Sequence, residues 1–291
     1  MLLGSLLLFM VSCETDSVEN TNQNVIGYKY TSETIPTDPA LPHYFSETIG
    51  NLQNGKFYTE TKTIYLNGVQ SGTSVTTQRY FYSNNRLDHF DRGDMMIYYY
   101  YNSDGDLIGC TGISTNPPGG TLYERYIHLP NNVVYCENMN LPYNDPNAVA
   151  GYRKILHLDN DGNVISAGSD PDMDGVAVNI YHYTYVNENL DAMQRPDGTV
   201  VTFAHSNVIN TSRYLMELSC GKQVMCLPCA TIFANGYAFG LSQGTYSKNL
   251  TSQEFSGSAF LVMPNGFYNK KTNVTNEPNG SHTEILEYFF N

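Results

Sequence analysis

Tryptophan is absent from this chain of 291 residues, and positively charged residues are scarce. The 15 Lys and Arg residues are outnumbered by 28 Asp and Glu, which gives a formal net charge of -13. A surface of this charge repels phosphate backbones and anionic membranes, so nucleic acid is not an expected partner. Charged residues make up 15% of the chain and hydrophobic residues 41%, a balance that excludes a disordered or fibrous protein.

Lys and Glu, which favour helices, are few, whereas the chain holds 24 Tyr, 24 Gly and many Asn and Thr. Tyr and Thr suit the pleated surface of a strand, and Asn and Gly supply the backbone angles of tight turns. The composition therefore predicts an all-β protein. Its length is enough to bury a sizeable core, in one large domain or two small ones.

The apolar run at the N-terminus, from Leu2 to Val11, is too short to span a bilayer. The stretch MLLGSLLLFMVSC resembles a bacterial lipoprotein signal, in which a small residue precedes a cysteine that is acylated. Ser12 and Cys13 match these places, and Met10 stands where the family usually has Leu. The resemblance implies a signal peptide over residues 1–12 and a lipid anchor on Cys13. The alternatives are an ordinary cleaved signal and a buried strand.

Residues 13–55 are expected to be a lipidated polar tether and lead-in. They begin with ETDSVENTNQN, which is polar and has no hydrophobic periodicity, as in a disordered tether. Acidic residues directly after the cysteine resemble the tags that take some Gram-negative lipoproteins to the outer face of the outer membrane. The implied location is the cell surface, with the membrane as one partner and an outer-membrane protein or a glycan as another.

Five stretches share one pattern: an aromatic or aliphatic segment, a short turn of Asn, Asp or Gly, and an apolar return segment. They are RYFYSNNRLDHF from Arg79, YYYYNSDGDLIGC from Tyr98, ERYIHLPNNVVYC from Glu124, RKILHLDNDGNVISAG from Arg153 and YHYTYVNENLDAM from Tyr181. The return segments open with Leu87, Leu107, Val134, Val164 and Leu190. Each stretch predicts a β-hairpin, because turn residues separate two segments that suit strands.

The hairpins predict the fold class: repeated antiparallel hairpins over residues 56–207 that form a large curved meander sheet. Residues 208–291 are expected to add strands that close or pack on this sheet within the same domain, with one short helix near SRYLMEL. In the run from Tyr98 to Tyr101, alternation places Tyr98 and Tyr100 on one face and Tyr99 and Tyr101 on the other. The hairpins resemble the tyrosine-aspartate (YD) repeats of the Rhs-type family and of related bacterial lipoproteins, which implies an architecture and no activity.

Two motifs suggest chemistry, and a structural use is favoured for both. GLSQG, residues 240–244, matches the nucleophile elbow that exposes a serine, here Ser242, but alternating strands and helices are missing and no Asp follows.

CGKQVMCLPC, from Cys220 to Cys229, could give three ligands of a zinc site with His205, or a redox pair. In an exported protein, disulfides or buried thiols are favoured, with Cys110 and Cys136 placed to cross-link successive hairpins. The remaining histidines are expected in half-buried, hydrogen-bonded positions.

The segment DPDMDGVAV repeats the first half of a calcium loop. Three carboxylates, Asp170, Asp172 and Asp174, precede Gly175, and the carbonyl group of Val176 would complete the set. The resemblance to EF-hand and thrombospondin-type loops ends at Tyr181, where an EF-hand has its bidentate Glu. Weak calcium binding is therefore predicted, and no other cofactor is expected. The alternative is a polar hairpin turn.

The leading functional hypothesis is a membrane-anchored, surface-exposed lipoprotein that acts as a binding, scaffolding or accessory module and not as an enzyme. The rival is an exported hydrolase of glycans with paired carboxylates in a tyrosine-lined cleft. Tyrosine faces could also stack on sugar rings, although packing in the sheet is favoured. A third reading, an exported eukaryotic glycoprotein, rests on four sequons, which begin at Asn210, Asn249, Asn273 and Asn279.

Overall fold

The computed structural model describes residues 25–71, 75–115, 119–227, 247–252 and 258–291. Strands dominate this part of the chain, as predicted. They are β1 (Val25–Pro36), β2 (Tyr44–Gln53), β3 (Lys56–Leu66), β4 (Val69–Gln70), β5 (Thr76–Ser83), β6 (Arg86–Asp91), β7 (Met95–Tyr101), β8 (Leu107–Ser114), β9 (Thr121–Leu129), β10 (Val133–Met139), β11 (Ala150–Leu158), β12 (Val164–Asp170), β13 (Val178–Val186), β14 (Asn189–Gln194), β15 (Val200–Thr202), β16 (His205–Ile209), β17 (Asn249–Thr251), β18 (Ala259–Val262), β19 (Tyr268–Glu277) and β20 (Gly280–Phe290). The helices are α1 (Thr211–Cys220) and α2 (Lys222–Cys226).

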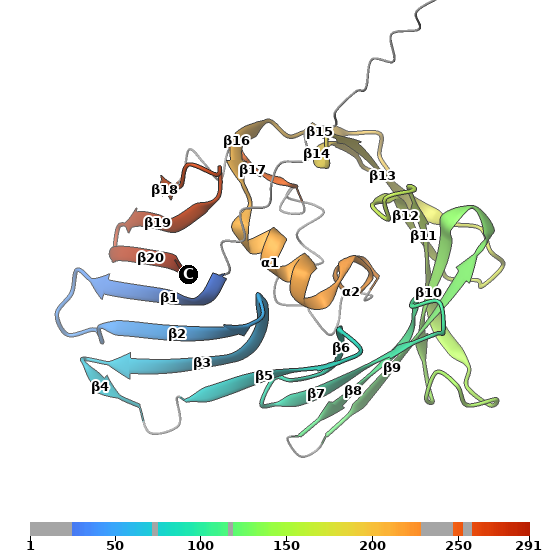
Figure 1. The fold of residues 1–291 in the computed structure, drawn as a ribbon, viewed down its shortest axis with the longest axis horizontal. Helices are drawn as coiled ribbons and strands as arrows, with labels where there is room; N and C mark the ends of the chain where they lie inside the picture. The colour runs from blue at the N-terminus through green and yellow to red at the C-terminus, as the bar shows by residue number, and fades with distance from the viewer. Residues whose placement is uncertain (1–24, 72–74, 116–118, 228–246, 253–257) are drawn as a thin grey trace, which may run out of the picture.

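All strands except β16 and β17 belong to one antiparallel sheet. Strands that follow each other in the sequence pair from β5 to β15, while β3 pairs with β5 and β2. The sheet continues through β1 to β20, β19 and β18. The described strands β15 and β18 are the two edges, so the sheet is not closed. The β16–β17 ribbon lies between these edges (Figure 1).

The five predicted hairpins are confirmed. They pair β5 with β6, β7 with β8, β9 with β10, β11 with β12, and β13 with β14. In each, the apolar residue near the start of the return strand is almost completely buried, with an exposed fraction of at most 1%; these residues are Leu87, Leu107, Val134, Val164 and Leu190. The return segment of each repeat therefore supplies one anchor of the core.

Two-residue turns explain why several strands reverse so tightly. Four hairpins turn through a pair of residues that both have positive φ: Asn54–Gly55, Asn67–Gly68, Asn84–Asn85 and Asn187–Glu188. Two positive φ angles define the type I′ turn, whose twist matches that of the flanking strands. The high Asn and Gly content of the chain is thus used where left-handed backbone is required.

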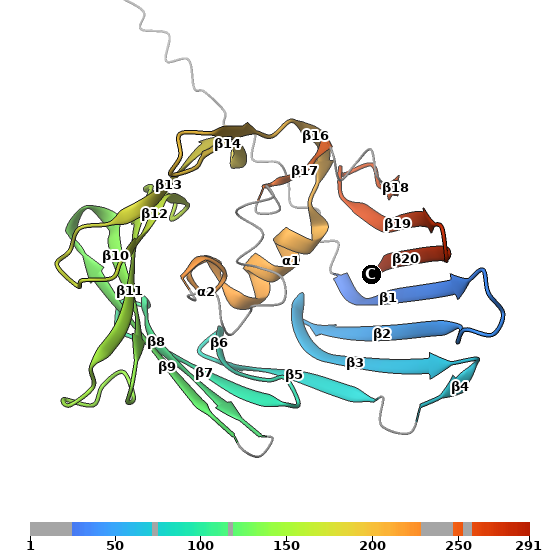
Figure 2. The same cartoon turned by 180° about the vertical axis from the view of Figure 1, so that it is seen from behind.

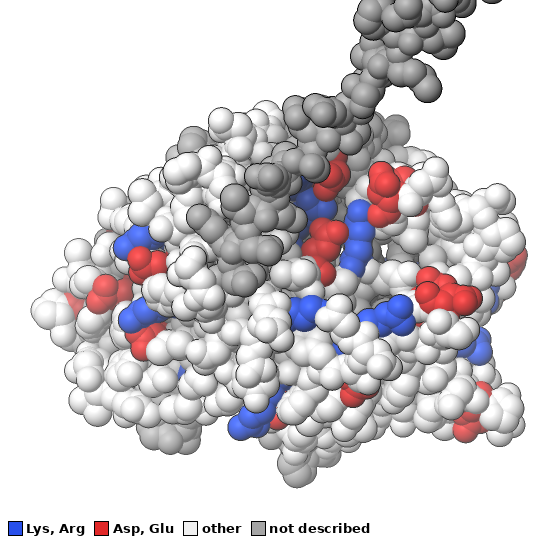
Figure 3. All heavy atoms as spheres, in the orientation of Figure 1, with Lys and Arg blue, Asp and Glu red and all other residues white. Residues whose placement is uncertain are grey.

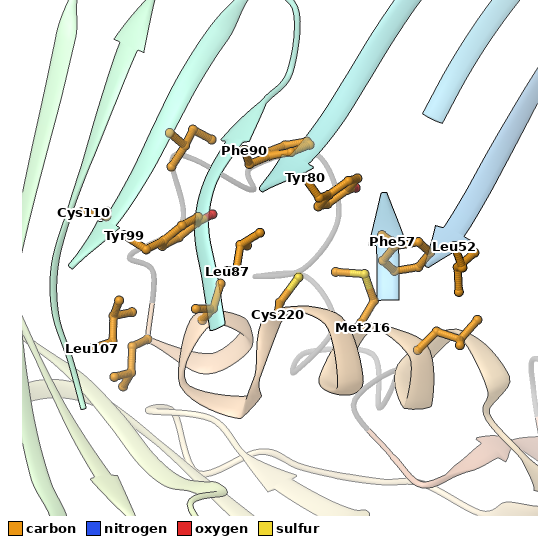
Figure 4. Packing of buried hydrophobic residues seen from close by; sticks show 14 of the residues in the cluster. Leu52, Phe57, Tyr80, Leu87, Phe90, Tyr99, Leu107, Cys110, Met216 and Cys220 are labelled. Carbon is orange, nitrogen blue, oxygen red and sulfur yellow. The ribbon is translucent and has the colours of Figure 1, made fainter. Parts of the chain in front are cut away.

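The sheet curls around α1 and α2, as the front and back views show (Figures 1 and 2). We call the face toward these helices the concave face and the opposite face the convex face. Buried side chains of β2, β3 and β5–β8 point from the concave face toward Met216 and Cys220 of α1 (Figure 4). The core therefore lies between the sheet and the helices, and α1 packs mainly against β3 and β6.

The predicted helix near SRYLMEL is confirmed as α1, and its ends follow capping rules. The side chain of Asn210 accepts a hydrogen bond from the backbone N–H of Arg213, and Gly221 with φ of 77° ends the helix. Hydroxyl groups bind α1 to the sheet: Ser219 Oγ accepts from Phe57 N at 3.0 Å, and Thr211 Oγ1 donates to Tyr268 O at 2.9 Å. Among the described residues, no helix combines the length and apolarity needed to cross a bilayer.

The four consecutive tyrosines occupy the two faces as predicted. On the concave side Tyr99 is buried, and the hydroxyl of Tyr101 donates to the carbonyl group of Leu87 at 3.0 Å. On the convex side Tyr98 stacks on the ring of His89, with ring centroids 5.4 Å apart, and Tyr100 stacks on a tyrosine of the β10–β11 loop. The run thus serves the packing of both faces of one strand.

Candidate functional site

Three residues with a predicted role lie outside the described residues. They are Cys13 of the lipoprotein signal, Ser242 of the elbow-like motif and Cys229 of the cysteine cluster. The side chain of Cys226, at the end of α2, is also outside the description. Lipidation of Cys13 stays a prediction.

The predicted calcium loop connects β12 to β13. Asp170 is fully buried, and its Oδ2 accepts a hydrogen bond from Nη1 of Arg153 at 3.1 Å. Asp174 Oδ1 accepts from the backbone N–H of Val176 at 2.8 Å, and Asp172 is exposed. No three His, Cys, Asp or Glu side chains of the described chain are placed to hold a metal ion. Within the described chain, Oδ1 of Asp170 has no hydrogen-bond partner. Calcium binding stays a prediction, which calorimetry with millimolar calcium tests.

Asp170 ends a ladder of ion pairs on the convex face, which the sequence analysis did not identify. Arg125 contacts Glu137 at 2.6 Å, Arg153 contacts the other oxygen of Glu137 at 2.7 Å, and Arg153 also reaches Asp170. The four residues are direct neighbours across β9, β10, β11 and β12. Because both carboxylates are buried, removal of one arginine would leave an uncompensated charge. The ladder therefore holds strands in register.

Disulfides and buried thiols were the two structural uses expected for the cysteines, and the structure has buried thiols at Cys110 and Cys136. Cys110, Cys136 and Cys220 are all buried thiols, and Cys110 Sγ donates a hydrogen bond to Glu124 Oε2 at 3.3 Å. Cys110 lies on β8 and Cys136 on β10, with β9 between them. Two strand spacings amount to about 9.6 Å, which exceeds the reach of a disulfide. Cys110, Cys136 and Cys220 therefore serve as buried thiols in the core.

The zinc and redox readings of the second cysteine cluster gain no support from Cys220. Burial raises the pKa of the Cys220 thiol to about 12, so the thiolate that binds metals or attacks disulfides is disfavoured. The expected fourth ligand, His205, contacts the carbonyl oxygen of Leu190 through Nε2 at 2.8 Å. Cys220 instead packs in the core against β6 and β7 (Figure 4).

Two carboxyl groups on the concave face receive hydrogen bonds from tyrosines. Tyr28 and Tyr80 both donate to Glu60, the latter at 2.8 Å. Burial raises the pKa of Glu60. Tyr126 donates to Glu124, which is completely buried. Glu60 is half-buried and Glu124 is completely buried, and both carboxyl groups are engaged by tyrosine hydroxyls.

A different part of the concave face carries polar side chains at its surface. We call the residues Asn138, Tyr152, Lys154, Ser169 and Tyr181, from β10 to β13, the concave patch. Lys154 lies directly opposite the buried Cys136 and also opposite Ser169, and Asn138 lies opposite Tyr152. Tyr181 lies opposite Ala167, which packs against the core. The patch therefore belongs to the face that looks toward the helices.

The exposure of the patch differs from that of the rest of the core-facing surface. Asn138, Tyr152, Lys154 and Ser169 are half-buried, and Tyr181 is 37% exposed. On the face shown in Figure 3, Lys, Arg, Asp and Glu side chains gather over α2 and the strand ends around it.

Next to the concave patch, burial raises the pKa of Tyr183 to about 12, with a smaller contribution from Tyr181. Tyr183 therefore stays neutral at physiological pH.

The hydrogen-bonding groups of the patch are only partly used within the described chain. Lys154 forms no ion pair there, and Asn138 Oδ1 is buried without a hydrogen-bond partner. Tyr152 and Ser169 share one hydrogen bond of 2.8 Å between their hydroxyls, which leaves one hydroxyl hydrogen for another acceptor. A buried polar atom without a partner costs about 1–3 kcal/mol, so a ligand that supplies the missing partners is stabilised.

The position of Lys154 on the core-facing side of its strand is predictable from the sequence. In the predicted strand RKILHL, Lys154 and Leu156 alternate with Arg153 and Ile155, so Lys154 shares the face of a core leucine. A lysine on the core face of a strand is unusual, because lysine is rarely buried without a partner. Asn138 could not be found in this way, because its neighbours across the sheet depend on the register.

A second polar cluster, centred on Glu284, is satisfied within itself. Tyr30 donates to Glu284 Oε1 at 2.5 Å, Asn273 donates to Oε2 at 3.4 Å, and Thr34 contacts His282 Nδ1 at 2.9 Å. The hydrogen bond from Tyr30 is the main reason that the pKa of Glu284 is lowered. These groups already have hydrogen-bond partners, so the cluster links β1, β19 and β20. It is therefore a weaker candidate for a ligand site than the concave patch.

No protein-family model and no curated protein matches this chain. Among solved structures, a porin-like protein from Bacteroides uniformis is similar, with a TM-score of 0.42 and 11% sequence identity. The alignment covers 92% of this chain and 98% of that protein.

Proposed function

We propose that this protein is an exported binding module, attached to the outer membrane at the cell surface by a lipid on Cys13, and that the concave patch is its ligand site. The N-terminal signal supports the anchor. The single observation that carries the binding function is the pair of unused groups on one face: the ammonium group of Lys154 and the buried Oδ1 of Asn138. A ligand there would give both groups a hydrogen-bond partner.

The shape of the sheet supports a binding role. Core side chains and α1 fill the concave face near β3 and β6, whereas the patch on β10 to β13 is half-buried. The ion-pair ladder on the convex side fixes the relative positions of β9 to β12. A site on paired strands is held more rigidly than one on loops, which lowers the entropy cost of binding.

A glycan hydrolase receives less support. Its two carboxyl groups must both reach the scissile bond, at a separation of about 5–10 Å. Tyrosines contact two carboxyl groups on the concave face, the half-buried Glu60 and the buried Glu124, and both already accept hydrogen bonds. We therefore assign no catalytic residue.

Native mass spectrometry of the full-length protein, purified from its own membranes in mild detergent, tests the proposal. We expect a bound small molecule on the wild type and its loss from Lys154→Met, which keeps the length of the side chain and removes the charge. Lys270→Met is the matched control, because Lys270 lies opposite Glu287 on the convex face. A wild type without any bound molecule, or equal retention by both variants, would contradict the proposal.

A further inference from the structure

The chemistry of the concave patch narrows the class of ligand. Resting on the proposed function, we infer that the patch takes an acidic sugar: a ring with one carboxylate and several hydroxyl groups, free or at the end of a glycan. The inference depends on the order of groups along the face, with a cation at Lys154, an acceptor at Asn138 and an exposed ring at Tyr181.

Lys154 sets the position of the negative group. Lys154 is half-buried as a residue, and its ammonium group has no carboxylate partner in the described chain, although the protein as a whole has a net charge of -13. An ammonium group carries three donors and no acceptor, so it is satisfied by an oxygen anion and repels an ammonium ligand. The ligand therefore presents its carboxylate to β11.

Asn138 sets the position of a hydroxyl group. Its buried Oδ1 accepts hydrogen bonds, so the ligand must present a donor there. Glu124 lies directly opposite Asn138 on β9, and its carboxyl group disfavours a second carboxylate nearby. A hydroxyl group meets both conditions. Asn138 and Lys154 are diagonal neighbours on adjacent strands, with their backbones roughly 7–8 Å apart, so one substituted sugar ring can contact both side chains.

The remaining patch residues suit the rest of a sugar. The hydroxyls of Tyr152 and Ser169 can each accept, and one of them can still donate, as can the hydroxyl groups of a sugar. The ring of Tyr181 is 37% exposed and offers an apolar surface to the C–H groups of a sugar ring. A fatty acid would leave these hydroxyl groups without partners, so an acidic sugar fits better than an acidic lipid.

Calorimetric titration of the full-length protein in detergent with glucuronate, glucose and glucosamine tests the inference. We expect glucuronate to bind most tightly, glucose more weakly, and glucosamine not measurably. Lys154→Met should weaken glucuronate about tenfold and leave glucose unchanged, because only the charge-assisted hydrogen bond is lost. Lys154→Arg should restore most of the preference, and Lys270→Met should behave as the wild type.

Glucosamine binding as tight as glucuronate binding, or equal glucuronate affinity in Lys154→Met, would overturn the inference. Failure of all three sugars to bind has two distinct meanings. If Lys154→Met still loses the molecule that co-purifies with the wild type, the ligand class is wrong and the binding function stands. If the co-purifying molecule is retained, both are wrong.

Discussion

Several tyrosines that face the core place their rings in contact with other side chains and their hydroxyls on nearby acceptors. Tyr82 donates to the carbonyl group of Phe57 at 2.8 Å, as Tyr101 does to Leu87. Tyr80 stacks on Phe90 with centroids 4.6 Å apart while its hydroxyl binds Glu60. A tyrosine supplies the large apolar ring for which other proteins also use Trp, and its hydroxyl extends further from the strand. The abundance of Tyr therefore reflects an interior with polar acceptors.

Glu60 makes stability depend on pH. Because burial raises the pKa of Glu60 above its ordinary value of 4.5, the folded protein holds the proton more tightly than the unfolded chain. The stabilisation is fully present below the unfolded pKa and is lost as the pH rises through the folded pKa. Glu60→Gln keeps an acceptor for Tyr28 and Tyr80 and removes this loss. We expect the advantage of Glu60→Gln in thermal midpoint to grow from pH 4 upward.

The control for this prediction is Glu277→Gln, at the exposed end of β19. This variant should follow the wild type at every pH, because an exposed carboxyl group is solvated in both states. If Glu60→Gln and the wild type lose stability in parallel as the pH rises, Glu60 is not the origin of the effect.

Turns are the elements that the sequence specifies most directly. Asn84 and Asn85 both have positive φ, with values of 49° and 64°, so residues with a β-branched side chain are strained there. We expect Asn84→Val to lower the free energy of unfolding by about 1–2 kcal/mol, measured by urea denaturation. Asn84→Gly should change it by a few tenths of a kcal/mol at most.

Ser83→Val serves as the matched control, because Ser83 ends β5 with its side chain exposed. It should cost less than half as much as Asn84→Val. Equal losses at the two positions would show that added apolar surface, and not the left-handed backbone, is responsible.

The hairpins could be predicted because each repeat contains its own turn and its own buried anchor, such as Leu107 after the Asp-Gly turn. The convex ladder and the concave patch could not, because they depend on which residues lie opposite each other in neighbouring hairpins. Bulges shift this register, as between Asn138 and Met139, and alternation alone does not locate them. For a related reason the sequence left a disulfide and buried thiols as alternatives for Cys110 and Cys136: the pairing of β9 between their two strands separates the thiols.

On the scale of the whole molecule, the lead-in is part of the sheet. Residues 25–53, expected to belong to a tether and lead-in, form β1 and β2, and β1 pairs with β20 as well as with β2. Only residues before 25 are then left to separate Cys13 from the sheet. At about 3.3–3.6 Å per extended residue, twelve residues reach roughly 40 Å at most.

The proposed lipid anchor on Cys13 gives a prediction for the whole molecule. Cys13→Ala, expressed at full length, should lose the acyl groups and move from the membrane fraction to the soluble fraction. Mass spectrometry of the N-terminal peptide and fractionation in detergent measure the two effects. Ser12→Ala keeps a small residue before Cys13 and should stay lipidated. A Cys13→Ala protein that remains acylated and membrane-bound would contradict the anchor.

The contact between β1 and β20 also bears on how the molecule folds. Most strands pair with a strand close in the sequence, whereas Tyr30 and Glu284, on β1 and β20, are 254 positions apart. The chain loses much more entropy in closing a loop of that length than in forming a hairpin, although the cost grows only logarithmically. We therefore expect the hairpins from β5 to β14 to form early and independently, and the β1–β20 junction to form late and to limit the overall folding rate. Until it forms, both strands expose edges that can pair with other chains.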